Sequence, residues 1–397
     1  MLCIGRLILG YGYGLGSIAV NRYIEEYVPL SLYGQMSAIN LFLGQLGSFA
    51  ALTSSAIYAK APINADPDIQ KEEQDKLYDE NTTWRLVFGL PILTYSLAMI
   101  SLIIFIRHDT PKYYIGKDDN DSAKYAIHRI YRTGESDIIA NKIIRFIKKS
   151  GDKTTTKATL IDSLFRDEKY IRASWTNIVV MIAHVLTGYS AVIAFSTTIF
   201  QDILKNPDTM TPEQGTYIVG LTSAIAAMIG IPVVRNFGRR TLLLYGHAIM
   251  AFLHFVLAFC AFMNYQMFII VMVNVFLLVY LTTSGPVAWI YSAETCTDAT
   301  LGIVIMTLWG TITLEVLTSK TIEAAITHVG FFAMFGVFNV LSTIYVFFSV
   351  GETKGLSETE KKEIYLPGAK YGRALQPGEK AVGVGNEHKS RKTLKSE

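Results

Sequence analysis

Long apolar stretches alternate with shorter polar ones along most of the chain. Nine of them are long enough to cross a lipid bilayer as helices, which takes about 20 residues at about 1.5 Å per residue. They cover approximately Leu2–Val20, Gln35–Ala59, Trp84–Ile106, Asn177–Phe200, Tyr217–Val234, Thr241–Met263, Met267–Ser292, Gly302–Thr318 and Phe331–Val350. Runs of this length do not fit the short alternating strands of a membrane barrel. The pattern predicts an all-α integral membrane protein with about nine transmembrane helices.

Composition supports this class and excludes others. Apolar residues make up 51% of the 397 positions and charged residues 17%, and the mean hydropathy is +0.32. A soluble domain of this size would not tolerate so much apolar surface in water. The net charge of +3 reflects an uneven placement of basic residues rather than a nucleic-acid-binding patch. We therefore expect the lipid bilayer, and no nucleic acid, as a partner.

The basic residues predict the orientation in the membrane. If the first helix begins outside, one side receives all but seven of the 36 Lys and Arg residues. The seven are Arg6, Lys60, Lys71, Lys76, Arg85, Lys205 and Lys320. By the positive-inside rule, the long linker and the C-terminal tail lie on the cytoplasmic side of a plasma membrane or on the matrix side of a mitochondrial inner membrane.

Four segments follow from these patterns. Residues 1–106 hold three transmembrane helices with a polar outer loop at 60–83, residues 174–350 hold a complete six-helix half, and residues 351–397 form a polar basic tail. In the polar linker, residues 107–173, apolar positions repeat at helical spacing at Ala126, Ile127, Ile130 and Tyr131, and again at Ile139, Ile143 and Phe146. The linker is predicted to form short amphipathic helices beneath the membrane domain, with a flexible, partly helical linker as the alternative.

Glycines on the first helix have a spacing typical of close helix packing. Gly10 and Gly14, like Gly12 and Gly16, are separated by one helical turn, which flattens one face of the helix. Their GxGxG appearance is not a nucleotide-binding loop, because no strand precedes it. We expect another membrane segment, from other subunits of a membrane complex, to pack on this face.

A further stretch, Tyr280–Glu294, contains a helix broken at Gly285-Pro286 with Trp289 one turn beyond the break. Proline removes a backbone donor, and many transporters use such a broken helix as a bending gate over a site near the middle of the membrane. A kink with only a structural role is the alternative.

The ionisable residues inside the predicted spans do not form a catalytic or metal-binding arrangement. His247 and His254 lie seven positions apart without a carboxylate nearby. The sequence therefore predicts no enzymatic activity, no cofactor and no metal site. His184 is either a proton-sensitive site residue or a neutral histidine bonded to a neighbouring helix. Glu315 and Lys320 are spaced poorly for a direct pair and are expected to have separate partners.

Short motifs resemble those of the sugar porters of the major facilitator superfamily. They are Gly5-Arg6 followed by GYGYGLG, Trp84-Arg85, Asp109 to Lys112, Phe237-Gly238-Arg239-Arg240, GPVAW at 285–289, and Gly351-Glu352-Thr353-Lys354-Gly355. Because their order and spacing extend over residues 5–356, the chain is identified as a member of this hexose-transporter-like family. The resemblance implies the major facilitator fold, with three further helices expected before the first one here.

The resemblance also implies which residues carry function. An active carrier would bind substrate with Trp289, His184, Ser190, Asn40 and Ser223. A gating charge network is expected from Arg239, Arg240, Glu294, Glu352, Glu26 and Arg85, with an ordinary salt-bridge cluster as the alternative.

Several positions depart from the family pattern. Residues other than the family's amides stand at Leu41, at His184-Val185, at Ser190, at Ser223 and, in an ungapped register from Glu294, at Ile312-Thr313. A sugar hydroxyl that loses its partner forfeits roughly 1–3 kcal/mol, so the inherited hexose site is expected to be lost. The charge network is altered too, with Arg235 in place of an acidic residue and with Ala299 and Leu301 in place of basic ones.

Two functions remain. The losses and the absent helices favour a transport-impaired descendant of a sugar porter, a pseudo-transporter retained as a structural subunit of a larger membrane complex. The alternative is an active carrier that moves a hexose or another small polar solute by alternating access. In that case a second chain supplies the missing helices, or an incomplete gene model has lost them.

Overall fold

The computed structural model describes residues 2–28, 30–54, 83–105, 108–131, 136–154, 159–203, 211–356, 358–362 and 364–365. Every regular element in these ranges is helical, which confirms the all-α prediction. The elements are α1 (Leu2–Tyr27), α2 (Leu30–Ser54), α4 (Thr83–Phe105), α5 (Pro111–Gly116), α6 (Asn120–Ile130), α7 (Asp137–Thr154), the π-helical turn η2 (Asp162–Arg166), α8 (Glu168–Val185), α9 (Tyr189–Ile203), α10 (Pro212–Asn236), α11 (Arg239–Phe262), α12 (Gln266–Thr282), α13 (Ser284–Thr295), α14 (Asp298–Ser349) and α15 (Glu358–Lys362). The predicted outer loop and most of the basic tail lie outside the described residues.

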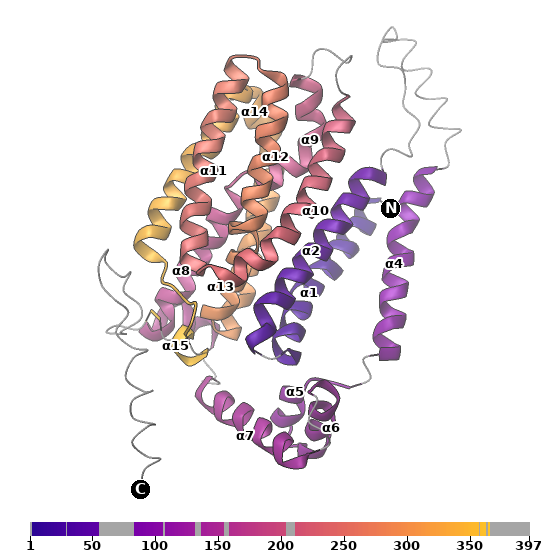
Figure 1. The fold of residues 1–397 in the computed structure, drawn as a ribbon, viewed down its shortest axis with the longest axis vertical. Helices are drawn as coiled ribbons and strands as arrows, with labels where there is room; N and C mark the ends of the chain where they lie inside the picture. Colours follow the sequence, from indigo (N-terminus) through magenta and orange to yellow (C-terminus); the bar gives the residue numbers. More distant parts are fainter. Residues whose placement is uncertain are drawn as a thin grey trace.

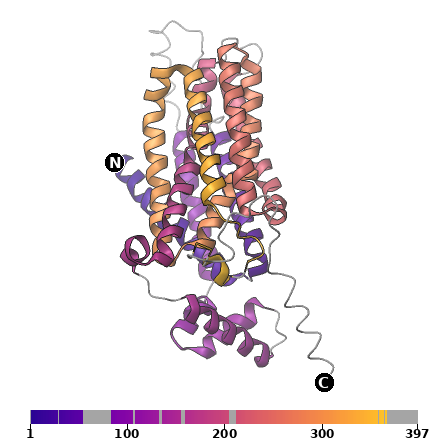
Figure 2. The same cartoon turned by 90° about the vertical axis from the view of Figure 1, so that its left-hand side faces the viewer.

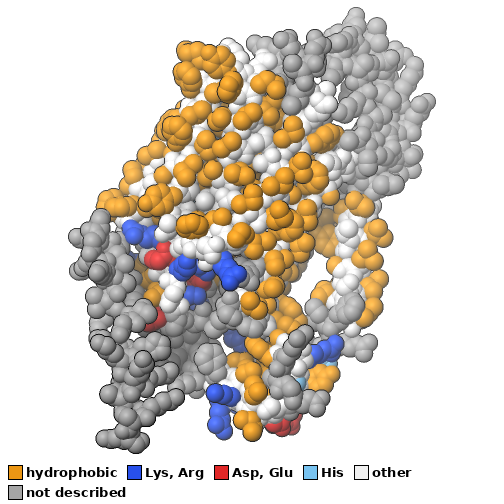
Figure 3. Space-filling model, in the orientation of Figure 1, with side chains coloured by type: hydrophobic (Ala, Val, Ile, Leu, Met, Phe, Trp, Pro, Cys, Tyr) orange, Lys and Arg blue, Asp and Glu red, His pale blue; other side chains and the backbone are white. Residues whose placement is uncertain are grey.

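Helices α8 to α14 form one bundle, and α1 and α2 pack beside it (Figure 1). The short helices α5, α6 and α7 form a separate group below the bundle (Figure 2). Within the described residues, five helices are long and apolar enough to cross a membrane, and the described side chains from Leu90 to Ile104 of α4 are exposed. Apolar side chains cover the side of the bundle, while charged ones gather at its lower end and on the helices below (Figure 3). This distribution is that of a membrane-spanning bundle with a charged lower end.

Two of the spanning helices are broken near their middle. Gly188 separates α8 from α9 with a φ of +87°, a conformation that side-chain-bearing residues rarely adopt. Thr283, with a φ of −122° and a ψ of −93°, separates α12 from α13. At Gly230 of α10, an added Cβ would lie 2.8 Å from the Leu281 carbonyl oxygen, so glycine allows α10 to approach this second break.

The second break lies earlier than the sequence predicts. Gly285 and Pro286 belong to the first turn of α13, and the non-helical residue is Thr283. Proline excludes a regular turn on its N-terminal side, because its ring meets the carbonyl of the residue four positions back and its nitrogen donates no hydrogen bond. In a first helical turn neither property is a defect, so the chain is interrupted before the proline.

A buried polar relay connects the two breaks. The Asn339 side-chain amide donates to the Thr187 carbonyl at 3.5 Å, and its oxygen lies 3.1 Å from His247 Nδ1. The other His247 nitrogen lies 3.3 Å from the Ser284 hydroxyl. Backbone groups freed by a helix break inside a membrane must find partners within the protein. The relay meets this need at Thr187 and joins the break between α8 and α9 to α11, α13 and α14, with His247 in a structural role.

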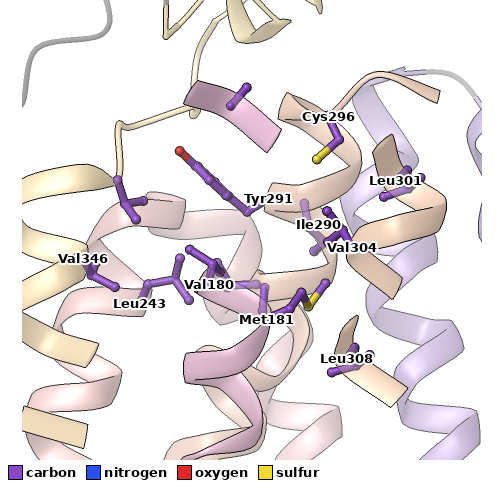
Figure 4. Close-up of a cluster of buried hydrophobic side chains, with 14 of the residues drawn as sticks. Val180, Met181, Leu243, Ile290, Tyr291, Cys296, Leu301, Val304, Leu308 and Val346 are labelled. Carbon is purple, nitrogen blue, oxygen red and sulfur yellow. The ribbon is translucent and has the colours of Figure 1, made fainter. Parts of the chain in front are cut away.

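The largest apolar cluster lies at the lower end of the bundle. Figure 4 shows side chains from several helices meeting there, among them Val180 and Met181 of α8, Leu243 of α11, Tyr291 of α13 and Val346 of α14. Residues near both ends of α14 contribute to this cluster. The cluster therefore fixes the relative positions of α8, α11, α13 and α14.

The element α14 consists of two helices joined across a kink, as the two predicted spans require. Thr327, with a φ of +63° and a ψ of 169°, separates the two helices, and the polar positions before it are helical. The Lys320 ammonium lies 3.0 Å from one Glu323 oxygen, and His328 Nδ1 lies 2.9 Å from the other. Lys320 therefore does not pair with Glu315. This agrees with their poor spacing in the sequence.

The linker contains helices where amphipathic ones are expected. Ile127 of α6 packs with Ala140 and Ile144 of α7 in a small apolar cluster. The buried face of α7 differs from the predicted one, since Ile139 is 46% exposed and Ala140 takes the buried position beside it. The Phe146 side chain lies outside the described ones. The amphipathic pattern thus identified the helices, but the phase of α7 differs by one residue.

Candidate functional site

Aromatic and amide side chains meet where α1 and α2 contact the bundle. The Tyr189 hydroxyl of α9 donates to the Gln45 side-chain oxygen of α2 at 3.1 Å. The Tyr13 ring of α1 meets the Trp309 ring of α14 edge to face, with centroids 5.3 Å apart. Both contacts join the first half of the chain to the second half. In a carrier of two moving halves, such a boundary is where a solute binds.

From Gln45 a connected series of side chains leads into the bundle, and we call Gln45, Tyr189, Tyr280 and His184 the aromatic chain. The Tyr189 and Tyr280 rings stack with centroids 4.2 Å apart and planes 14° apart. The Tyr280 hydroxyl lies 2.9 Å from His184 Nε2. The break at Gly188 turns α9 relative to α8, so that His184 and Tyr189, on either side of it, both reach Tyr280.

Three side chains of this region carry buried polar atoms that have no hydrogen-bond partner among the described residues. They are His184 at Nδ1, Trp309 at Nε1 and Glu315 at both carboxylate oxygens. The Ser190 hydroxyl and the Ala191 backbone amide lie near the Glu315 carboxylate, but without hydrogen-bonding geometry. Since buried polar groups in native proteins are almost always paired, these unpaired donors and acceptors are candidates for contact with a bound polar molecule.

A second group of polar residues surrounds Glu294 at the lower end of α13. Glu294 is 4% exposed, and one of its oxygens lies 3.1 Å from both the Arg239 guanidinium and the Lys361 ammonium. Its other oxygen accepts from the Thr353 hydroxyl at 2.6 Å. We call Glu294, Arg239, Lys361 and Thr353 the Glu294 cluster. Lys361, which follows α14 on α15, supplies a second cation for Glu294 where neither Ala299 nor Leu301 can.

Glu352 and Arg240 take partners other than each other. Glu352 accepts from the backbone amides of Arg239 at 2.8 Å and Thr241 at 3.5 Å, so it caps the N-terminus of α11. The Arg240 guanidinium donates to the Phe347 carbonyl at 2.9 Å and lies over the Phe347 ring. The expected network is therefore centred on Glu294, and Arg240 ties α11 to the end of α14.

The last described residues are held by a pair of tyrosines. The Tyr291 and Tyr365 hydroxyls are hydrogen-bonded to each other, and both lie near the Gly351 backbone amide. Burial raises the pKa of Tyr365 to about 12, so its hydroxyl keeps its proton at neutral pH. This pair and the Glu294 cluster both hold the segment after α14 against α13.

The first half contains a smaller polar contact. Glu26 of α1 accepts from the Thr110 hydroxyl at 2.6 Å and lies 3.7 Å from the Lys112 ammonium. The Thr110 side chain also caps α5, so Glu26 fixes the start of the linker helices against α1. The side chain of Arg85, the other expected member, lies outside the described ones.

A family description accounts for this architecture. The model of the family described as "Sugar (and other) transporter" matches residues 1–365. The chain belongs to the sugar transporter family. The sequence motifs predict this membership, and the match confirms it. Members of this family are carriers, not enzymes, and no group of three or more potential metal ligands occurs among the described residues.

Individual transporters resemble the chain over most of its length. It is 26% identical over 395 residues to myo-inositol transporter 1 of Saccharomyces cerevisiae, covering 92% of this chain and 63% of that one. It is 25% identical over 366 residues to facilitated glucose transporter member 3 of Ovis aries, with 89% and 68% covered. Hexose transporter 1 of Toxoplasma gondii is 26% identical over 383 residues, with 90% and 63% covered. The chain thus spans about two thirds of the length of these relatives.

Solved structures show the same fold. The proton:xylose symporter XylE bound to 6-bromo-6-deoxy-D-glucose superposes with a TM-score of 0.71 at 20% identity, covering 91% of this chain and 73% of that one. The inward-open conformation of XylE from E. coli gives a TM-score of 0.63. The chain is therefore an integral membrane protein of the major facilitator fold.

The substrate-binding residues implied by the family pattern lie in different surroundings. His184 belongs to the aromatic chain and Ser190 faces Glu315. The Ser223 hydroxyl is bonded to the Val219 carbonyl of its own helix at 2.8 Å, and half-buried Trp289 packs against the apolar cluster. Asn40 is half-buried on α2 with no described contact to the aromatic chain.

The sequence pattern assigns no role to Gln45, Tyr189, Tyr280 or Trp309. Gln45 lies one helical turn beyond Leu41 and therefore on the same face of α2, so it can serve in place of the amide expected at Leu41. Trp309 lies four positions before Thr313, where an ungapped register from Glu294 places the tryptophan of the family's Asn-Trp pair. Allowing a shift of one helical turn would have found both residues.

Proposed function

We propose that this protein is an active carrier of a small polar solute, which binds between the two halves at the aromatic chain and moves by alternating access. The observation that carries the proposal is the set of unpaired buried polar atoms on His184, Trp309 and Glu315. Membership of a family of carriers agrees with it.

The chemistry of the unpaired atoms suits a solute rich in hydroxyl groups. When His184 Nε2 accepts from Tyr280, Nδ1 carries a hydrogen and is a donor that no described acceptor meets with hydrogen-bonding geometry. Trp309 Nε1 is a second donor, and the Glu315 oxygens are acceptors. Each hydroxyl of a polyol or sugar both donates and accepts, so one such solute can satisfy all three side chains. The Tyr189 and Tyr280 rings provide an apolar surface for its C–H groups.

Polar side chains of the proposed site replace the hydrogen-bonding side chains that the family pattern has and this chain lacks. Leu41, Val185 and Ile312 supply no hydrogen bonds, yet Gln45, His184 and Trp309 lie on the same helices within one turn of them. The site therefore keeps a comparable number of polar groups in changed positions. We infer that selectivity differs from that of a hexose carrier, rather than that transport is lost.

Uptake by the full chain in liposomes tests the function. We expect saturable, competable uptake of glucose or myo-inositol, and His184→Leu should raise KM by about tenfold, since a lost buried hydrogen bond costs roughly 1–3 kcal/mol. Ser223→Ala is the matched control, because its hydroxyl is bonded within its own helix. Uptake indistinguishable from that of empty vesicles for both solutes would contradict the proposal.

One observation favours the second candidate, a transport-inactive subunit of a membrane complex. A Cβ added at Gly10, Gly12, Gly14 or Gly16 would meet nothing within 4 Å, so both sides of α1 that carry these glycines are open in the structure. Helices of another protein could pack there, as could further helices of the same polypeptide.

Gly12→Leu tests this second candidate. If other subunits pack against the α1 glycines, native gels of a mild-detergent extract should show a particle well above 44.1 kDa plus the micelle, and Gly12→Leu should release the chain from it. Leu15→Ala, on the same exposed helix, is the control. A monodisperse monomer that Gly12→Leu leaves unchanged would count against the complex.

A further inference from the structure

Among the residues that the structure describes, Glu315 is the buried carboxylate with no cation beside it. Three Glu residues are buried among the described ones, Glu294 at 4%, Glu323 at 7% and Glu315 at 8% exposed. Glu294 has the Arg239 and Lys361 cations, and Glu323 has Lys320 and His328. The protein thus gives each of the other two a pair of basic partners and gives Glu315 none.

The groups that face Glu315 cannot neutralise a negative charge. Helix α9 contributes the Ser190 hydroxyl and the Ala191 amide, and α12 contributes Tyr280. The Lys320 ammonium, on the same helix, is bound to Glu323 and lies over the Phe195 ring. An ionised carboxylate buried without a partner is unfavourable by several kcal/mol. A positive charge from outside the chain would remove that cost.

The surroundings of Glu315 fit an ammonium group. Tyr280 lies within electrostatic range of the carboxylate and its ring stacks on Tyr189, and the faces of aromatic rings attract cations. Both carboxylate oxygens lack partners, and the three N–H donors of an ammonium can serve both. A proton would occupy one oxygen only and would itself need an acceptor.

We propose that Glu315 determines the specificity of the site and that the solute it selects carries a protonated amine, as an amino sugar or amino polyol does. This inference rests on the proposed carrier function and names its substrate class. The hydroxyl groups of the solute pair with His184 and Trp309, and its ammonium group pairs with Glu315. Neutral sugars would bind with the carboxylate unpaired and therefore more weakly.

Equilibrium binding to the purified full chain at neutral pH tests the inference, with glucosamine and glucose as probes. The two sugars differ only by an ammonium group in place of one hydroxyl. Glucosamine should bind at least about tenfold more tightly, and Glu315→Gln should abolish the preference. Glu323→Gln, a buried Glu→Gln change on the same helix, should preserve it. If Glu315→Gln does not fold, Glu315→Asp keeps the charge on a shorter side chain and should retain the preference at lower affinity.

Three results would overturn the inference. The first is equal affinity for the two sugars, and the second is a glucosamine preference that survives in Glu315→Gln. The third is glucose binding that depends on pH only while Glu315 is present, without a glucosamine preference, because Glu315 would then bind a proton instead. Saturable uptake of myo-inositol together with any of these would leave the carrier function standing, whereas absence of uptake of all three solutes would count against the carrier function itself.

Discussion

Gly188→Ala should destabilise the protein by about 2–5 kcal/mol, because it combines backbone strain with a steric clash. Gly188 has a φ of +87°, and a Cβ added there would lie 2.9 Å from Phe335 Cγ. Phe335 is itself 2% exposed and has no room to retreat. Because the residue forms the break between α8 and α9, the change should also displace Tyr189 from Tyr280 and abolish solute uptake.

Thermal denaturation of the purified protein in detergent measures this effect, and Gly310→Ala is its matched control. Gly310 lies inside α14, where an added Cβ meets nothing within 4 Å. Replacing glycine inside a helix should be neutral or stabilise by up to about 1 kcal/mol. Equal melting temperatures for the two variants would show that the break does not require glycine.

Glu294→Ala should destabilise by about 3–5 kcal/mol, the usual cost of removing one partner from a buried ion pair. It would leave the Arg239 and Lys361 side chains, only 13% and 14% exposed, without their carboxylate. Because Lys361 holds α15 to α13 through Glu294, the tail should also become more susceptible to proteolysis. Melting temperature and limited proteolysis together measure the change.

Lys112→Ala is the control for this substitution, since the Lys112 pair with Glu26 is partly exposed and contributes about 1 kcal/mol or less. The double variant Glu294→Ala with Lys361→Met should lose less than the sum of the single variants, because the two residues share one interaction. Strict additivity would mean that Lys361 stabilises the protein by some other contact.

The spans and the family could be predicted from the sequence because both depend on local patterns. Apolar runs mark α10 and α11 to within a few residues, and short motifs identify the family. The sequence places the break at Gly285-Pro286, two residues later than the observed break at Thr283, because the proline that causes it acts on the preceding turn. The two apolar runs within α14 mark its two helices on either side of the kink at Thr327, but the first helix extends beyond Thr318 to include Lys320 and Glu323, which pair with each other.

The candidate site was predictable only in part. His184 and Ser190 follow from the family pattern, whereas Tyr189 and Tyr280 become partners only through the turn at Gly188, which no local pattern encodes. Trp309 lies one helical turn away from its expected register. Lys361 could not be assigned to Glu294, since the two residues lie 67 positions apart and meet through the fold.

The fluorescence of Trp309 tests the central claim most directly. The chain has four tryptophans, so one variant can retain only Trp309 and a second only Trp289, the rest being replaced by Phe. Titrating glucose, glucosamine and myo-inositol into each purified variant reports which ring a bound solute approaches. A solute at the aromatic chain should produce a saturable emission change in the variant that retains Trp309, and a small or absent one in the variant that retains Trp289. A saturable change confined to Trp289 would place the solute elsewhere and contradict the account.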